Sequence, residues 1–347
     1  MVFSVRLAPC CRKFSKLIAN VHAGSEKRIK ANLTLPTVSV LIPCYNAEKY
    51  IGETLDSVFR QTWRELEIIV VDDGSQDGSI AEVERFPAAR VQLIRQTHMG
   101  ASVARNRAYR TSKGEFIQFL DADDLIEPDK LERQITRLMA YPKCVASAEW
   151  GRFYTAPYQT RFEPEPVWRD LPPLDWLALS RADGLGMMFP AIWLIPRLVA
   201  NAAGPWEESL SVGDDGEYFT RVLLASDQVL FCSGARCHYR SGISGSLSGR
   251  KSSAGWASQL RVLELCERYV REREDSERVR RGFALSWQHF AHACYPYDRQ
   301  LASFALAYAS RLHPVTIRPR GGPTFEVVSA LIGWRNARRL QVISGRP

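Results

Sequence analysis

The chain has 347 residues, of which 46% are hydrophobic and 24% are charged. This composition excludes a largely disordered chain, and the length is typical of one large α/β domain with a smaller appendage or of two domains. The net charge of +8 favours anionic partners, but the basic residues gather at the two ends, and we expect no nucleic-acid partner.

The first 35 residues are rich in lysine and arginine and contain one acid, Glu26. We expect a basic leader without stable structure; a transit peptide and an anchor for anionic lipid remain open alternatives. No later segment supplies the roughly 18 consecutive apolar residues of a membrane-spanning helix, since the run at 187–196 ends at Arg197. The eight cysteines show no paired metal-ligand spacing, so we expect reduced thiols in a cytoplasmic protein.

From Thr37 onward, short apolar runs alternate with segments of helical periodicity. Such alternation predicts right-handed crossovers and a mostly parallel sheet with helices on both faces. A ligand site in this architecture lies beyond the carboxyl ends of the strands. The expected strands are VSVLIPCYN, LEIIVVDDGS, VQLIRQ and EFIQFLDADD, and the expected helices cover 47–61, 79–86 and 101–111.

The unusual polar residues all follow the ends of these strands. Asp121, Asp123 and Asp124 place three carboxylates within four positions, and their mutual repulsion is costly without a cation. A divalent cation that carries a diphosphate is a common natural partner of such a cluster. The sequence therefore predicts an enzyme that acts on a nucleotide-activated substrate. The other strand ends carry Pro43, Tyr45 and Asn46, then Asp72, Asp73 and Gly74, and then His98 and Gly100.

Together, the run from VSVLIPCYN to DDGSQDGS, the segment GASVARNRA and the segment GEFIQFLDADD resemble the catalytic domain of family 2 glycosyltransferases. The resemblance is close over 37–129 and looser to about Ser248. It implies a GT-A fold over 36–250, with a nucleotide-binding half at 36–129 and an acceptor half at 130–250. It also implies inverting transfer of a sugar from a nucleoside diphosphate donor to a glycan or lipid-linked acceptor. A Q-x-x-R-W signature is not visible after Asp215, which resembles the non-processive branch.

The resemblance also implies roles for acidic residues. Asp123 matches the direct ligand of Mg²⁺ or Mn²⁺, and Asp121 matches a contact to the ribose or to the metal through water. Asp215 matches the general base, in a segment where Asp214 stands in place of the usual glutamate. An alternative is that Asp214 and Asp215 only complement a helix dipole. His238 is a candidate for a third metal contact, and a structural imidazole is its alternative.

Donor binding is predicted for residues near the strand ends. The resemblance places Pro43, Tyr45 and Asn46 against the nucleobase, uses Asp72 or Asp73 without ranking them, and brings Arg105 to the nucleotide or its phosphates. Arg240 is a candidate phosphate clamp. The Gly/Ser-rich segment 241–249 is expected to close over the diphosphate. The donor-binding set is Pro43, Tyr45, Asn46, Asp72, Asp73, Arg105, Asp121 and Arg240.

Residues 251–347 shift to helix formers and charge, which predicts an extension of two or three amphipathic helices. The segment 325–341 joins an apolar stretch to Arg335, Arg338 and Arg339, and this favours a hypothesis of peripheral membrane contact. A nucleotide-sugar-binding or nucleotidyltransferase-like protein without sugar transfer is the alternative function. A dinucleotide-binding dehydrogenase is disfavoured, because the first strand is not followed by G-x-G-x-x-G.

Overall fold

The computed structural model describes residues 35–184, 186–243, 252–319 and 321–343, and the chain from Pro36 onward forms one compact unit. The expected leader at 1–35 and most of the Gly/Ser-rich segment at 241–249 lie outside the described residues.

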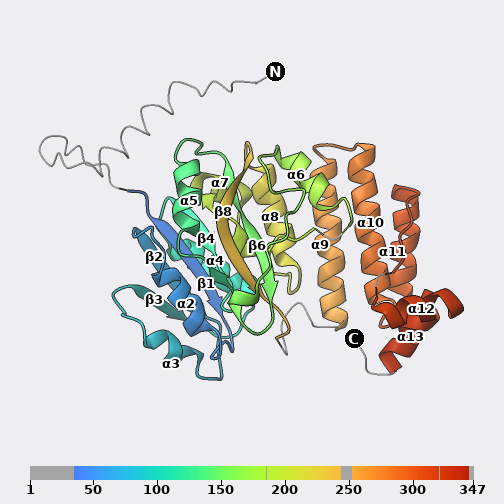
Figure 1. Ribbon diagram of the computed structural model, residues 1–347, viewed down its shortest axis with the longest axis horizontal. Coiled ribbons are helices and arrows are strands. Elements are labelled where there is room, and N and C mark those ends of the chain that lie inside the picture. The colour runs from blue at the N-terminus through green and yellow to red at the C-terminus, as the bar shows by residue number, and fades with distance from the viewer. Residues whose placement is uncertain (1–34, 185, 244–251, 320, 344–347) are drawn as a thin grey trace, which may run out of the picture. The chain divides into compact units, whose positions relative to one another are not determined.

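Five strands form the larger sheet, in the order β3-β2-β1-β4-β7 (Figure 1). The first four run parallel and β7 is antiparallel to β4. This arrangement confirms the predicted parallel-dominated α/β sheet. The strands are β1 (Val38–Cys44), β2 (Leu66–Asp72), β3 (Val91–Arg95), β4 (Phe116–Phe119) and β7 (Ile195–Pro196).

The central strands β1 and β2 are apolar runs, buried along most of their length, as expected for strands covered on both faces. Their register pairs Cys44 with Asp72, so the two strands end level with each other. The backbone N–H of Asp73 then donates to the carbonyl of Cys44 at 2.8 Å. The loops that leave β1 and β2 therefore start side by side.

Three helices connect these strands: α2 (Ile51–Phe59), α3 (Ser79–Glu84) and α4 (Ala101–Thr111). The prediction for α4 is confirmed at both ends, whereas α2 begins four residues later than expected. The reason is the segment before α2, where Ser79 Oγ accepts the N–H of Ala47 at 2.7 Å and Asp77 accepts that of Glu48 at 3.1 Å. These bonds hold the entry to α2 as a turn rather than as helix.

A second sheet of three strands has the order β5-β8-β6. Its strands are β5 (Leu125–Ile126), β6 (Val145–Phe153) and β8 (Val229–Arg240), and α5 (Lys130–Leu138) packs against it. Since β5 follows Asp124 directly and Leu125 pairs with His238, β8 returns the chain to the aspartate cluster.

Shorter elements surround α8 (Asp214–Leu224). Helices α6 (Pro173–Ser180) and α7 (Arg197–Ala203) both pack against α8. Two 3₁₀ turns, η1 (Pro157–Gln159) and η2 (Pro190–Ile192), lie in the long connections.

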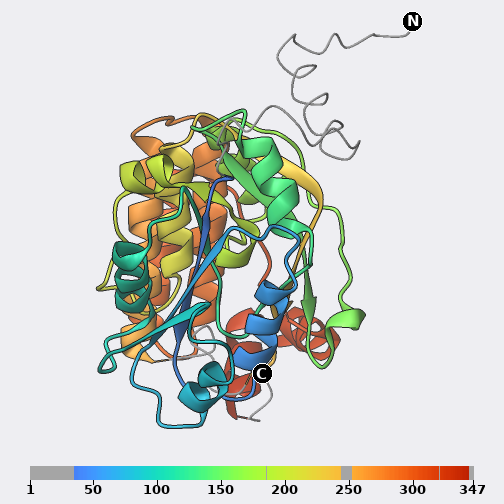
Figure 2. The same ribbon diagram turned by 90° about the vertical axis from the view of Figure 1, so that its left-hand side faces the viewer.

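After residue 252 the described chain is helical, and α9, α10 and α11 stand side by side in Figure 1. One hydrophobic core runs from the parallel sheet into these helices, and Figure 2 shows them behind the sheet. The described residues form five helices here rather than two or three. None of them is both long and apolar enough to cross a membrane. Their bounds are α9 (Ser253–Arg271), α10 (Glu277–Cys294), α11 (Arg299–Leu312), α12 (Pro323–Ile332) and α13 (Trp334–Ile343).

Candidate active site

The aspartate loop, residues 121–124, lies between the end of β4 and the start of β5. Thr54 of α2 fixes its backbone, because its hydroxyl donates to the carbonyls of Ala122 at 2.9 Å and Asp124 at 3.0 Å. Burial beside Asp121 raises the pKa of Asp123 to about 7. Burial, with Asp123 and Asp121 nearby, also raises the pKa of Asp124 well above its usual range. The backbone of the loop is thus held in place, and its three neighbouring carboxylates disfavour one another's ionised forms.

Arg240, at the end of β8, braces the aspartate loop from the other side. Its backbone N–H donates to Asp124 Oδ1 at 3.0 Å and its Nε to the carbonyl of Asp123 at 2.9 Å. Its guanidinium also contacts Glu53 at 2.5 Å, and its side chain is only 8% exposed. These contacts make Arg240 a positioning residue for the loop, and its role as a phosphate clamp stays a prediction.

Arg105 of α4 joins the aspartate loop to the first turn of α8. One guanidinium nitrogen contacts Asp121 Oδ1 at 2.7 Å and another contacts Asp214 Oδ2 at 2.6 Å. The guanidinium also lies 4.4 Å from the ring centroid of Trp206. The side chain is 6% exposed, and its guanidinium is buried together with the two carboxylates that pair with it. Arg105 therefore holds two carboxylates, and a direct contact to the nucleotide stays a prediction.

Asn106, the residue after Arg105, also links α4 to the segment before α8, because its side chain bonds to the backbone of Trp206. Asn106 Nδ2 donates to the carbonyl of Trp206 at 2.9 Å, and the N–H of Trp206 donates to Asn106 Oδ1 at 2.8 Å. The Trp206 ring stacks on Tyr218 of α8 at 4.1 Å. The segment GASVARNRA therefore links the aspartate loop to α8 and to the loop that carries Trp206.

Asp215 lies in the first turn of α8, after Gly213 with φ +79°. Its Oδ1 accepts the N–H of Gly216 at 2.7 Å, and the side chain is half-buried. Burial and the neighbouring Asp214 raise the pKa of Asp215 to about 7, while the Gly216 N–H and Arg105 oppose this rise. A carboxylate of this kind can accept a proton near neutral pH. The dipole of α8 also stabilises acids at this position, so both predicted interpretations are compatible.

The loops after β1 and β2 form the other side of the site. Asn46, at φ +49°, accepts the N–H of Gln76 at 2.8 Å, and its own N–H donates to Ser75 Oγ at 3.0 Å. The exposed ring of Tyr45 stacks on His98 at 4.1 Å. Pro43 lies within β1, opposite Val71. The loops that follow β1 and β3 therefore share one stacked aromatic pair.

Asp72 and Asp73 differ in how their carboxylates are used. Asp73 accepts bonds from Gln96 Nε2 at 2.7 Å and from the N–H groups of Met99 at 2.9 Å and Gly100 at 2.8 Å. Its carboxylate holds the turn before α4. Asp72 Oδ2 accepts two longer backbone bonds, and its Oδ1 has no hydrogen-bond partner within the described part of the chain. Asp72 has the greater remaining capacity to accept a bond.

A family model matches the part of the chain that carries the aspartate loop and the loops after β1 and β2. Residues 39–199 match the model described as Glycosyl transferase family 2. These residues form a family 2 glycosyltransferase domain. The match covers β1 to the start of α7 and includes the aspartate loop, but it ends before Asp214 and Asp215 of α8.

Curated relatives match about a third of the chain. Glycosyltransferase GlyA from Streptococcus pneumoniae is 35% identical over 118 residues, which are 33% of this chain and 17% of GlyA. The Escherichia coli UDP-Glc:alpha-D-GlcNAc-diphosphoundecaprenol beta-1,3-glucosyltransferase WfgD is 40% identical over 103 residues, which are 29% of this chain and 41% of WfgD. The chain matches less than half the length of each of these relatives.

Solved structures match nearly the whole chain at low sequence identity. S. aureus TarS 1–349 in complex with UDP-GlcNAc has a TM-score of 0.58 and 16% identity, with 89% of this chain and 92% of TarS covered. The mannosyltransferase PcManGT from Pyrobaculum calidifontis, in complex with GDP-Man and Mn²⁺, has a TM-score of 0.51 and 18% identity, with 96% and 91% covered. These likenesses show that the family 2 domain has a GT-A fold.

The aspartate loop has the chemistry of a divalent cation site. Carboxylate oxygens are the ligands that Mg²⁺ and Mn²⁺ prefer. Asp124 Oδ2 is buried without a partner among the described residues, and burial together with the nearby Asp121 raises the pKa of Asp123, which a bound cation would oppose. No group of three or more His, Cys, Asp or Glu side chains in the described part of the chain is arranged to hold a metal alone. A cation here would take further oxygens from a diphosphate and water.

His238 is the predicted third metal contact. Its Nδ1 lies 2.8 Å from Thr160 Oγ1 and its Nε2 lies 2.8 Å from Glu127 Oε1, and the side chain is buried. Both ring nitrogens are therefore occupied, and the alternation along β8 turns His238 to the opposite face from its neighbours. These contacts favour the alternative of a structural imidazole, and a metal contact of His238 stays a prediction.

Sequence reasoning gave no role to three side chains that the structure brings to the family 2 site. His98 stacks on Tyr45, Glu53 contacts Arg240, and Trp206 lies against Arg105. Only His98 carried a usable signal, because it follows the third strand at its carboxyl end. Glu53 lies on α2 and Trp206 lies in the loop before α8. Their partners, Arg240 and Arg105, are distant in the sequence, and no local sequence pattern indicates these contacts.

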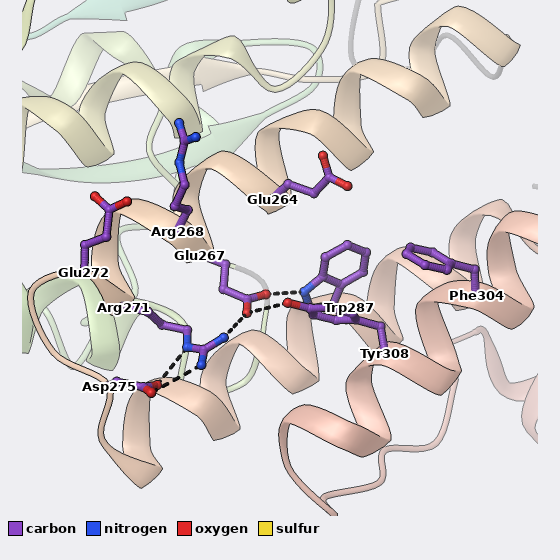
Figure 3. Close-up of a pocket in the computed structure, with 9 residues that line it drawn as sticks. All are labelled: Glu264, Glu267, Arg268, Arg271, Glu272, Asp275, Trp287, Phe304 and Tyr308. Carbon is purple, nitrogen blue, oxygen red and sulfur yellow. Dashed lines mark hydrogen bonds and ion pairs between the residues drawn. The ribbon is translucent and has the colours of Figure 1, made fainter.

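A cavity of about 440 Å³ lies elsewhere, between α9, α10 and α11 (Figure 3). Its centre is Glu267, which accepts bonds from Trp287 Nε1 at 2.6 Å, Arg271 at 2.8 Å and the Tyr308 hydroxyl at 2.9 Å. Because these polar groups already satisfy one another, the cavity is explained by the packing of the three helices.

Proposed function

We propose that this chain is a glycosyltransferase that moves a sugar from a nucleoside diphosphate donor to an acceptor hydroxyl. The observation that carries the proposal is the double ion pair of Arg105 with Asp121 and Asp214. It brings the predicted diphosphate side and the predicted base side of the reaction into one network. The family 2 domain at 39–199 supports the same reaction class.

The proposal includes Mg²⁺ or Mn²⁺ on Asp123, with Asp121 beside it. When bound, such a cation supplies positive charge to the departing diphosphate. Asp124 and Arg240 keep Asp123 in place through the contacts of the aspartate loop. The Mn²⁺ in the PcManGT complex supports a cation in this fold.

Asp215 is the proposed general base. It would take the proton of the acceptor hydroxyl as that oxygen attacks the anomeric carbon from the side opposite the diphosphate, which inverts the configuration. Its half-buried position and raised pKa support this role. Asp214 is already paired with Arg105 and is the less suitable base.

Donor binding is proposed for the surface formed by Tyr45 and Asn46, with Pro43 behind it. We favour Asp72 over Asp73 as the acidic donor contact, because the Asp73 carboxylate is fully used within the protein. The complexes of TarS with UDP-GlcNAc and of PcManGT with GDP-Man support a nucleotide-sugar donor. A glycan or lipid-linked glycan is the proposed acceptor, in line with the name of WfgD.

The test combines turnover with nucleotide binding. Wild type, Asp123→Asn and Asp215→Asn are assayed with a panel of UDP- and GDP-sugars, and binding of UDP and GDP is measured by calorimetry with and without Mn²⁺. We expect Asp123→Asn to lose Mn²⁺-dependent binding, and Asp215→Asn to keep binding but lose turnover by about 10²- to 10⁴-fold. Proton NMR of the product reports inversion.

The control is Asp227→Asn, which changes an exposed carboxylate just after α8. It should match wild type in both assays. Turnover that survives both Asp123→Asn and Asp215→Asn would refute the proposed roles. Mn²⁺-dependent nucleotide binding without turnover of any donor would favour the alternative, a nucleotide-sugar-binding protein.

A further inference from the structure

The outer face of α12 is apolar. Phe325 is the buried residue of this helix, whereas Val327 is 62% exposed and Leu331 is 79% exposed. Val327 and Leu331 are four residues apart and so lie on one side of the helix, turned away from Phe325. Contiguous exposed aliphatic side chains of this size mark a contact surface.

The outer face of α13 combines basic and apolar side chains. Ala337 is buried, and Arg335, Arg339 and Ile343 follow one another at a spacing of four on the other side. Ile343 is 81% exposed, and both arginines are exposed. Residues 321–343 contain one acid, Glu326, against three arginines.

The two exposed arginines lie near the same aromatic ring. The guanidinium carbons of Arg335 and Arg339 lie 5.9 and 5.7 Å from the ring centroid of Tyr295, at the end of α10. Neither arginine has an ion pair within the described part of the chain. Two exposed guanidiniums near one ring, without an acidic partner among the described residues, suit contact with phosphate groups.

Aromatic contacts pack α13 against α10 and against α12. Trp334 contacts the rings of His292 at 4.7 Å and Tyr295 at 5.0 Å, and the Arg338 guanidinium lies 4.4 Å from the ring of Phe325. Figure 1 shows α12 and α13 beside one end of α10 and α11. The inner faces are therefore occupied by the protein, and the outer residues remain for an outside partner.

We propose that Val327, Leu331, Arg335, Arg339 and Ile343, together the α12–α13 face, dock on an anionic lipid surface. The aliphatic side chains would enter the boundary between headgroups and acyl chains, and the arginines would contact lipid phosphates. A lipid surface fits better than an acidic protein, because the face offers both aliphatic side chains for insertion and unpaired cations beside them. This inference does not rest on the proposed function, since docking needs no donor.

The experiment is co-sedimentation of the full chain with vesicles of phosphatidylcholine alone or mixed with phosphatidylglycerol, at low and high salt. We expect binding to the mixed vesicles that weakens with salt. Arg335→Gln with Arg339→Gln should weaken this binding by about fivefold for each arginine. Leu331→Ser with Ile343→Ser should weaken it by about tenfold at both salt concentrations.

The matched control is Arg60→Gln with Arg273→Gln, which removes the same charge from two exposed arginines elsewhere. Unchanged thermal unfolding verifies that each variant is folded. If both α12–α13 variants bind like the control, the proposal fails. It also fails if Leu331→Ser with Ile343→Ser alters only the self-association seen by sedimentation velocity, or if the wild type binds inorganic phosphate but not vesicles.

Discussion

Asp123 and Asp215 are both carboxylates partly withdrawn from water beside a second acid. Burial raises the pKa of each to about 7. Between about pH 4 and pH 7 the folded chain therefore keeps protons that the unfolded chain has released. The stability that these protonated side chains contribute is complete below about pH 4 and is lost as the pH rises through 7. At neutral pH the ionised forms of these two side chains therefore lower the stability of the fold.

The reaction should lose rate below neutral pH. Asp215 must be ionised to accept a proton, so kcat/KM should rise up to about pH 7 and level off above it. With saturating Mn²⁺ the acid limb should fall about tenfold for each pH unit, because the cation keeps Asp123 ionised. With little Mn²⁺ the fall in rate should be steeper, because Asp123 then also takes up a proton in this pH range. Steady-state rates at both Mn²⁺ concentrations measure this, and a rate that stays flat down to pH 5 would exclude Asp215 as the base.

Replacing Asp123 by the neutral Asn should stabilise the protein where the carboxylate is ionised. At pH 8 and without metal, Asp123→Asn should raise the free energy of unfolding by about 1 kcal/mol, since it removes a partly buried repulsive charge. Below pH 4, where both side chains are neutral, the difference should vanish. Urea unfolding at the two pH values tests this, with Asp227→Asn as the control. A loss of stability at pH 8 would mean that burial and the nearby Asp121 do not disfavour the ionised Asp123 carboxylate.

At the level of elements, the parallel strands and α4 could be predicted from local signals. The strands are short apolar runs, and Gly100 immediately precedes α4. The second sheet could not be predicted. β5 has two residues, and β8 joins it from more than one hundred positions along the chain. The late start of α2 depends on Ser79 and Asp77, which are also remote.

The site shows the same limit. The sequence predicts which acids gather, because each follows the carboxyl end of a strand or starts a helix. It does not predict that Arg105 holds Asp121 and Asp214, or that both nitrogens of His238 are occupied by Thr160 and Glu127. Those partners are set by the packing of β8 and α8, which no local pattern records.

The three long C-terminal helices should depend on Glu267. Glu267→Ala would leave the Trp287 N–H, the Tyr308 hydroxyl and Arg271 without their shared acceptor, and we expect a loss of about 3 to 5 kcal/mol in the free energy of unfolding. Chemical denaturation measures this loss. The control is Glu264→Ala, which lines the same cavity but makes only a 3.6 Å ion pair with Arg261. Equal effects of the two substitutions would contradict the central role of Glu267.

At the scale of the whole molecule, one hydrophobic core joins the parallel sheet, α8 and the C-terminal helices. The helices after residue 252 are therefore part of the structure that holds the site. Ser258 of α9 makes the most direct link, because its Oγ accepts the N–H groups of Ser211 at 2.9 Å and Val212 at 3.0 Å. These two residues immediately precede Gly213 and the acidic first turn of α8.

Ser258→Ala should therefore affect both stability and catalysis, although Ser258 lies outside the family 2 match. The buried N–H of Val212 and the partly buried N–H of Ser211 would lose their acceptor, at a cost of about 1 to 3 kcal/mol, and the turn that carries Asp215 would loosen. We expect kcat to fall several-fold while Mn²⁺-dependent nucleotide binding is unchanged, because the aspartate loop is held separately by Thr54 and Arg240. The control is Ser310→Ala at an exposed position of α11. A variant that loses stability but keeps full kcat would mean that the C-terminal helices support the fold without positioning the base.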